Sequence, residues 1–187
     1  MMIIKDTFLE ISNNFEKLAK ESSAEISVAY ELMIKSIKNG GKIIYCGNGG
    51  SAADSQHLAA ELIGRYRKNR KPIPALALTT DTSIITAIAN DFSFDEVFSR
   101  QIEALGDKND VLYAISTSGK SRNIIACMKL AKLKNIKVIG LTGNDGSQMS
   151  EYCDVLIKTP SNRPDRIQEM HIAIGQLLCQ LIEDDLY

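Results

Sequence analysis

The chain has 187 residues, of which 44% are apolar and 24% are charged, which suits a single folded domain with a full core and argues against disorder. A net charge of −1 and the absence of Trp leave no general attraction for nucleic acid or anionic membranes and few rings for base stacking. No apolar run approaches the roughly 20 residues of a bilayer span. Without a secretory leader pattern, and with four scattered cysteines, we expect a cytoplasmic protein with reduced thiols.

Apolar residues at helical spacing predict two N-terminal helices, over residues 3–20 and 22–39. Beyond them, short apolar runs alternate with helical patterns. Strands are predicted at 42–46, 74–78, 110–115, 137–141 and 154–157. Helices are predicted at 51–67, at 83–104 as one or two, at 121–134, at 146–151 as a single turn, and at 165–185. This alternation predicts an α/β fold, in which helices cover both faces of a five-stranded parallel sheet.

The terminal helices lie outside this alternation and carry more apolar surface than one sheet face needs. We therefore expect a single domain over 1–187, in which N-terminal helices (1–40) precede an α/β core with a C-terminal helix (41–187). Part of the apolar surface of the terminal helices is expected to pack between subunits as a helix bundle.

Two loops after predicted strands are unusual, and ligands of open α/β sheets bind at the carboxyl ends of the strands. The first loop, 47–51, contains three glycines, which let the backbone approach a ligand closely. The second, 116–121, brings four hydroxyls to the start of a helix. Hydroxyls, free backbone N–H groups and a helix dipole together suit a phosphate. An ordinary strand-to-helix turn with Ser121 as the helix cap remains the alternative.

Two nucleotide-binding motifs are matched only in part. Residues 47–52 fit G-x-G-x-x-A, but the acidic residue that should follow about 20 positions later is missing, since Asp81 lies more than 30 residues on. Residues 114–121 resemble a P-loop with Ala114 in place of its first Gly. We therefore expect no nucleotide cofactor.

His57 and Glu61 are four residues apart on a predicted helix, so their side chains share a face. An imidazole and a carboxylate near the ligand edge are half of a metal or acid/base site, although an exposed surface pair has the same spacing. The segment 165–171 opens the last helix with several polar groups. Charge that complements the helix dipole is the simpler explanation for that segment.

Together these residues resemble the phosphoheptose isomerases of the sugar isomerase (SIS) domain family. The matching segments follow the family's order along nearly the whole chain: 46–51, 57–66, 89–92, 98–101, 115–121, 141–143 and 165–169. The resemblance implies a flavodoxin-like three-layer sandwich and a homotetramer packed through the terminal helices. It also implies cytoplasmic conversion of D-sedoheptulose 7-phosphate to D-glycero-D-manno-heptose 7-phosphate, for lipopolysaccharide or capsule.

The resemblance further implies roles for individual residues. The phosphate would be held by Ser116, Thr117, Ser118 and Ser121. The sugar would be contacted by Asn48, Gly49, Gly50, Glu61, Arg65, Asn90, Asp91, Asp165 and Gln168. One zinc ion per subunit would be bound by His57, Glu61, Gln168 and Gln176, and the catalytic groups would be Glu61, Gln168 and Gln176.

One position departs from the family pattern, which usually has a second His where this chain has Gln176. His171 lies five residues earlier, about 140° around the helix, and should not substitute for it. A neutral amide cannot exchange protons near neutral pH, so we expect weak zinc binding and leave the second proton transfer unassigned. The alternative is a non-enzymatic SIS protein that binds a replication initiator or senses a sugar phosphate.

Overall fold

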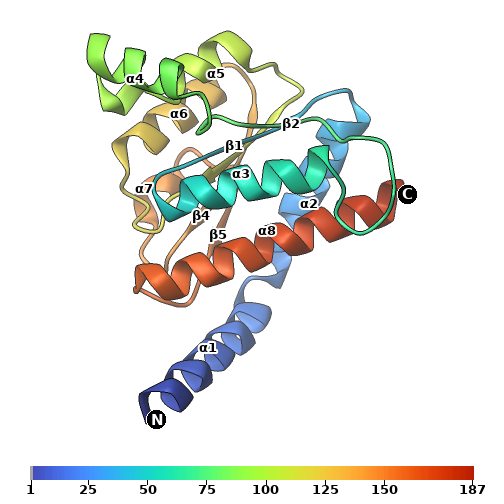
Figure 1. Ribbon diagram of the computed structural model, residues 1–187, viewed down its shortest axis with the longest axis vertical. Helices are drawn as coiled ribbons and strands as arrows, with labels where there is room; N and C mark the ends of the chain where they lie inside the picture. Colours follow the sequence, from blue (N-terminus) through green and yellow to red (C-terminus); the bar gives the residue numbers. More distant parts are fainter. Residues whose placement is uncertain (1) are drawn as a thin grey trace.

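The structure is a computed structural model and describes residues 2–187. Its strands are β1 (Ile43–Gly47), β2 (Ala75–Ala77), β3 (Val111–Ile115), β4 (Lys137–Thr142) and β5 (Val155–Lys158). They form one parallel sheet in the order β2-β1-β3-β4-β5 (Figure 1). This is the flavodoxin-like order, with its switch point between β1 and β3. The predicted five-stranded parallel sheet is confirmed.

Helices cover both faces of the sheet, as predicted. One face packs against α2 (Ser23–Lys38), α3 (Gly50–Ile63) and α8 (Pro164–Leu186), and the other against α5 (Ser99–Leu105), α6 (Arg122–Leu133) and α7 (Ser147–Ser150). Successive strand residues alternate between the two cores. Tyr45 and Tyr113 belong to the core under α3 and α8, whereas Cys46 and Ala114 belong to the core under α6. Because both faces are buried, the strands are apolar throughout.

Most element boundaries lie within one residue of the prediction, but one helix is shorter. The helix predicted over 51–67 ends at Ile63, and Gly64 follows as its C-terminal cap. The region 83–104 forms α4 (Thr82–Asp91), the 3-10 turn η1 (Phe94–Glu96) and α5. The early end of α3 gives the segment from Gly64 to β2 a loop conformation, and this loop borders the site described below.

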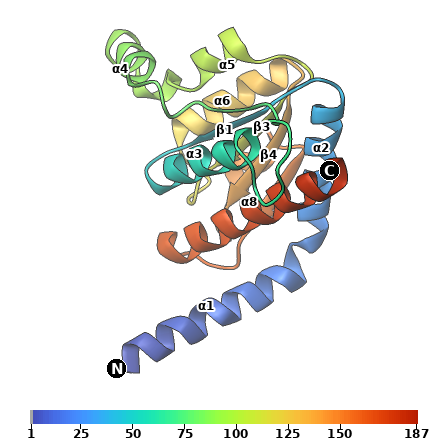
Figure 2. The same ribbon diagram turned by 45° about the vertical axis from the view of Figure 1, so that its right-hand side comes forward.

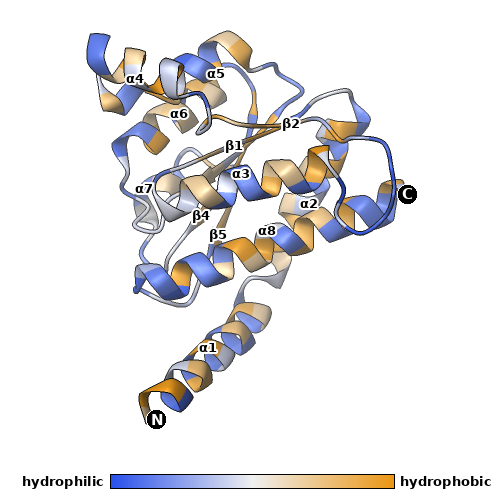
Figure 3. Ribbon diagram, viewed as in Figure 1, coloured by the Kyte–Doolittle hydropathy of each residue, from blue (hydrophilic) through white to orange (hydrophobic). Residues whose placement is uncertain are grey.

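The first helix, α1 (Met2–Glu21), extends away from the body of the domain (Figures 1 and 2). Within it, Asn14 and Leu18 are buried. Its N-terminal end is largely apolar, as the colouring of Figure 3 shows, and several of its apolar side chains are exposed. The exposed residues are Met2, Ile3, Ile4, Phe8 and Leu9. Among the helices within residues 2–187, none has the length and hydropathy required to cross a bilayer.

Candidate active site

Two loops meet at the carboxyl edge of the sheet. The neighbouring strands β1 and β3 end in register, with Gly47 opposite Ile115. The side-chain amides of Asn48 and Asn123 exchange two hydrogen bonds of 2.9 Å, which join the loop before α3 to the first turn of α6. Gly49 has a φ of +55°, a left-handed conformation that favours glycine. The predicted sugar-binding residue Asn48 therefore also holds the two loops together.

The loop 116–121 borders a cavity of about 420 Å³, which Thr117 and Ser118 help to line. The hydroxyl of Ser116 lies 3.0 Å from that of Ser121 and donates to it. Ser121 precedes α6 in the cap position, yet its hydroxyl does not cap the helix. Ordinary capping therefore does not explain this serine-rich turn. The hydroxyls lie instead at the N-terminal end of a 12-residue helix, where an anion is favoured.

A second polar cluster lies where α3 packs beside α8. His57 Nε2 is 3.0 Å from Glu61 Oε1. The amide nitrogen of Gln176 lies 3.1 Å from His57 Nε2 and donates to Glu61 Oε1 at 3.3 Å. The side chains of His57 and Glu61 are 54% and 21% exposed, so a ligand can reach both. Gly175 allows the close approach of α8, because a Cβ there would collide with Leu58.

The fourth predicted metal ligand, Gln168, lies apart from this cluster in the structure. The amide of Gln168 packs against Gly50, so closely that a Cβ on Gly50 would lie 2.6 Å from Gln168 Nε2. Gln168 precedes Gln176 by eight residues, which is about 12 Å along α8. A single chain thus brings His57, Glu61 and Gln176 together and places Gln168 near the loop after β1.

The remaining predicted residues lie at the surface. Asn90 donates to the carboxylate of Asp91 at 2.8 Å, at the exposed end of α4. Asp165, at the start of α8, accepts from Arg163 at 2.7 Å, and this bond lowers the pKa of Asp165 below its ordinary value. Arg65 is exposed in the loop after α3. Within residues 2–187, the hydrogen-bond partners of the Gln176 amide are His57 and Glu61, and none of these four residues is among them.

Sequence reasoning missed two features beside the site. Asp54, three residues before His57 on α3, has a buried Oδ2 without a hydrogen-bond partner. Burial raises the pKa of Asp54 to about 6, while His57 acts to lower it. Arg70 and Glu183 form a buried ion pair at 2.7 Å. The helical spacing from His57 could have identified Asp54, whereas no local pattern joins two residues that are 113 positions apart.

The side chains that meet at this cluster could contribute three donor groups to a metal ion. Among residues 2–187, no three His, Cys, Asp or Glu side chains converge, so a cation here would have one imidazole, one carboxylate and one amide. Rotation of the Gln176 amide exchanges its nitrogen and oxygen, which turns a carbonyl oxygen towards the other two groups. Imidazole and carboxylate are ordinary zinc ligands. The third donor would be a neutral amide, which carries no charge to attract a cation.

Comparison with known proteins identifies relatives along nearly the whole chain. Residues 8–143 match the family model of the SIS domain. A phosphoheptose isomerase of a Nitratiruptor species is 50% identical over 181 residues, 97% of each chain. One from Campylobacter jejuni subsp. jejuni serotype O:6 is 54% identical over 172 residues, 90% of this chain and 92% of the relative.

Solved structures agree with the sequence comparison. The phosphoheptose isomerase of Neisseria gonorrhoeae has a TM-score of 0.92 and 44% identity, covering 98% of both chains. That of Francisella tularensis has a TM-score of 0.93 and 35% identity, covering 97% of this chain and 96% of the other. The chain therefore belongs to the SIS domain family and, within it, to the phosphoheptose isomerases.

Proposed function

We propose that the protein is an isomerase that converts D-sedoheptulose 7-phosphate to D-glycero-D-manno-heptose 7-phosphate. The observation that carries the proposal is Glu61, a partly buried carboxylate that contacts an imidazole and an amide and is open to a ligand. Near-full-length relatives at about half identity bear the name of this activity. The product would serve heptose synthesis for lipopolysaccharide or capsule, in the cytoplasm.

The reaction moves a proton from C1 to C2 of the ketose through an enediol, and Glu61 is the base that carries it. Gln168 and a neighbouring donor stabilise the developing oxyanion by hydrogen bonding, and Gln176 adjoins the base. Because a neutral amide does not exchange protons near neutral pH, neither Gln performs the transfer between the two oxygens. The 116–121 loop binds the phosphate, and its binding energy orients the reacting end.

One zinc ion per subunit, weakly held, is part of the proposal. His57, Glu61 and Gln176 would hold it, and Gln168 is the further ligand expected from the sequence. When bound, zinc would polarise the substrate carbonyl. Equilibrium dialysis followed by metal analysis tests this part. Full zinc occupancy that survives a strong chelator would contradict weak binding.

A homotetramer is also proposed, because within one chain Gln168 lies apart from the other three predicted metal ligands. Gly50, which contacts Gln168, lies eleven residues before Glu61 on α3, about 16 Å along the helix. The exposed apolar end of α1 would be buried by terminal helices of other subunits. Light scattering tests the assembly, and Phe8→Glu should lower the measured mass. A wild-type monomer would exclude it.

Glu61→Gln tests the central role of the carboxylate. We expect turnover to fall by about 10³-fold, since general-base catalysis contributes 10²–10⁴-fold, while the Kd for sedoheptulose 7-phosphate stays near that of the wild type. NMR detection of the aldoheptose phosphate measures turnover. Glu103→Gln, at an exposed position on α5, is the matched control. Normal turnover by Glu61→Gln would remove Glu61 from the role.

The second candidate is a protein that binds the sugar phosphate or a protein partner without turnover. The observation that favours it is Gln176, which leaves Glu61 with a neutral neighbour on α8. The same NMR experiment separates the candidates, because a sensor would bind sedoheptulose 7-phosphate and form no product.

A further inference from the structure

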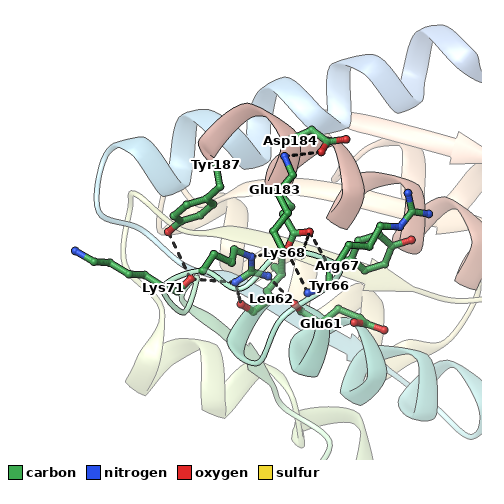
Figure 4. A network of polar contacts seen from close by, with 10 residues as sticks. Glu61, Leu62, Tyr66, Arg67, Lys68, Lys71, Glu183, Asp184 and Tyr187 are labelled. Atoms are coloured by element: carbon green, nitrogen blue, oxygen red, sulfur yellow. Dashed lines mark hydrogen bonds and ion pairs between the residues drawn. The ribbon is translucent and has the colours of Figure 1, made fainter.

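A buried ion pair contacts the backbone of Glu61, within the network of polar contacts drawn in Figure 4. Arg70, in the loop after α3, and Glu183, near the end of α8, have side chains that are 0% and 2% exposed. Arg70 Nε donates to Glu183 Oε2 at 2.7 Å. Burying two charges is unfavourable unless their remaining polar atoms are also satisfied. The partners of this pair therefore indicate what it holds.

Arg70 binds the end of α3. Its Nη2 donates to the backbone carbonyl of Glu61 at 2.8 Å, and its Nη1 donates to that of Leu62 at 2.8 Å. The last carbonyls of a helix lack partners within the helix, and a cation there also meets the negative end of the helix dipole. The guanidinium thus holds the backbone of the residue whose side chain is the proposed base.

Glu183 binds the loop that follows α3. Its Oε1 accepts the N–H groups of Arg67 and Lys68, each at 2.8 Å, and its Oε2 accepts that of Tyr66 at 3.2 Å. Burial acts to raise the pKa of Glu183, but these backbone bonds and Arg70 outweigh it and lower the pKa. The three amides come directly after Arg65, the predicted sugar contact.

We propose that Arg70 and Glu183 are positioning residues for the isomerase reaction, which hold the Glu61 carboxylate and the loop of Arg65 in a defined arrangement. The inference rests on the proposed role of Glu61. Both side chains are too buried to touch a substrate, so they act through the backbone of other residues. Because a displacement of about 1 Å at a reacting group can lower a rate on the order of 100-fold, loosening the pair should lower kcat.

Two variants and one matched control test the proposal. Arg70→Lys keeps a positive charge beside Glu183 but loses the planar fork that reaches both helix carbonyls. Glu183→Gln keeps the size of the side chain but removes its charge. The control is Asp184→Asn. Asp184 is the next residue on α8 and pairs with Lys68 of the same loop at 2.9 Å, but at the surface.

Circular dichroism establishes that each variant is folded, and three quantities are then measured: kcat, KM for sedoheptulose 7-phosphate, and amide hydrogen exchange at residues 66–68. We expect kcat to fall at least tenfold in Arg70→Lys and Glu183→Gln, with faster exchange at the three amides. Asp184→Asn should match the wild type. Should Glu183→Gln fail to fold, Arg70→Lys alone decides.

Three outcomes would overturn the inference: unchanged kcat in a folded variant of the pair, unchanged exchange of the loop amides, or an equal loss of kcat in Asp184→Asn. A wild-type protein without any turnover on sedoheptulose 7-phosphate would refute the proposed function instead. The two failures are therefore distinguishable.

Discussion

Replacing His171 on α8 should make the stability of the protein less sensitive to acid. The residue is 1% exposed, so its ring is almost completely removed from water. Burial lowers the pKa of His171 from 6.5 to about 4, and the Thr142 backbone opposes this only in part. The folded protein thus keeps the ring neutral at a pH where the unfolded chain takes up a proton.

The expected effect follows from the two pKa values. A difference of about 2.5 between them corresponds to about 3 kcal/mol of unfolding free energy. Because the unfolded state binds more protons between pH 6.5 and 4, stability rises with pH across this window and is lost as pH falls through it. His171→Leu and His171→Gln remove the titrating group. Between pH 7 and 4, the unfolding free energy of both variants should therefore fall by about 3 kcal/mol less than that of the wild type.

Urea unfolding at several pH values and one protein concentration measures the effect. The two variants differ in shape and polarity, so their stabilities near neutral pH will differ. Their shared property is a flatter dependence on pH between about 7 and 4. Curves that run parallel to the wild type over this range would refute the conclusion that His171 is buried in its neutral form.

Three further predictions concern the site. Asp54→Asn should raise the free energy of unfolding by about 1–2 kcal/mol at pH 8 and leave it unchanged near pH 4. The reason is that the wild type loses stability as the pH rises towards the elevated pKa of Asp54, about 6, and partial exposure weakens the effect. Equal gains at both pH values in urea unfolding would contradict this. Gly50→Ala should leave the fold intact and raise KM, because a Cβ displaces the flexible Gln168 amide; an unchanged KM would remove Gln168 from substrate binding. Gln176→His should raise zinc affinity about tenfold or more in a chelator competition, because an imidazole replaces a neutral amide; unchanged affinity would place zinc elsewhere.

The apolar pattern of the sequence by itself determined the order and type of the elements. Five short apolar runs between helical patterns have one compact solution, a parallel sheet covered on both faces. The end of α3 was predicted wrongly, because the apolar pattern continues to Tyr66 while the helix ends at Ile63. Arg70 binds the carbonyls at that end, and its partner Glu183 is remote in sequence.

At the site, too, the sequence determined some features and the tertiary structure determined others. His57 and Glu61 share a helix face by local spacing alone, so the sequence identified them as a pair. Local spacing could not place Gln176 beside them, because it lies 115 residues from Glu61, and only the family resemblance suggested it. The packing of α8 on α3 is what brings its amide within 3.3 Å of Glu61. Burial likewise sets the pKa of Asp54 and His171. These properties depend on which helix faces meet, and helical periodicity specifies an apolar face but not its partner.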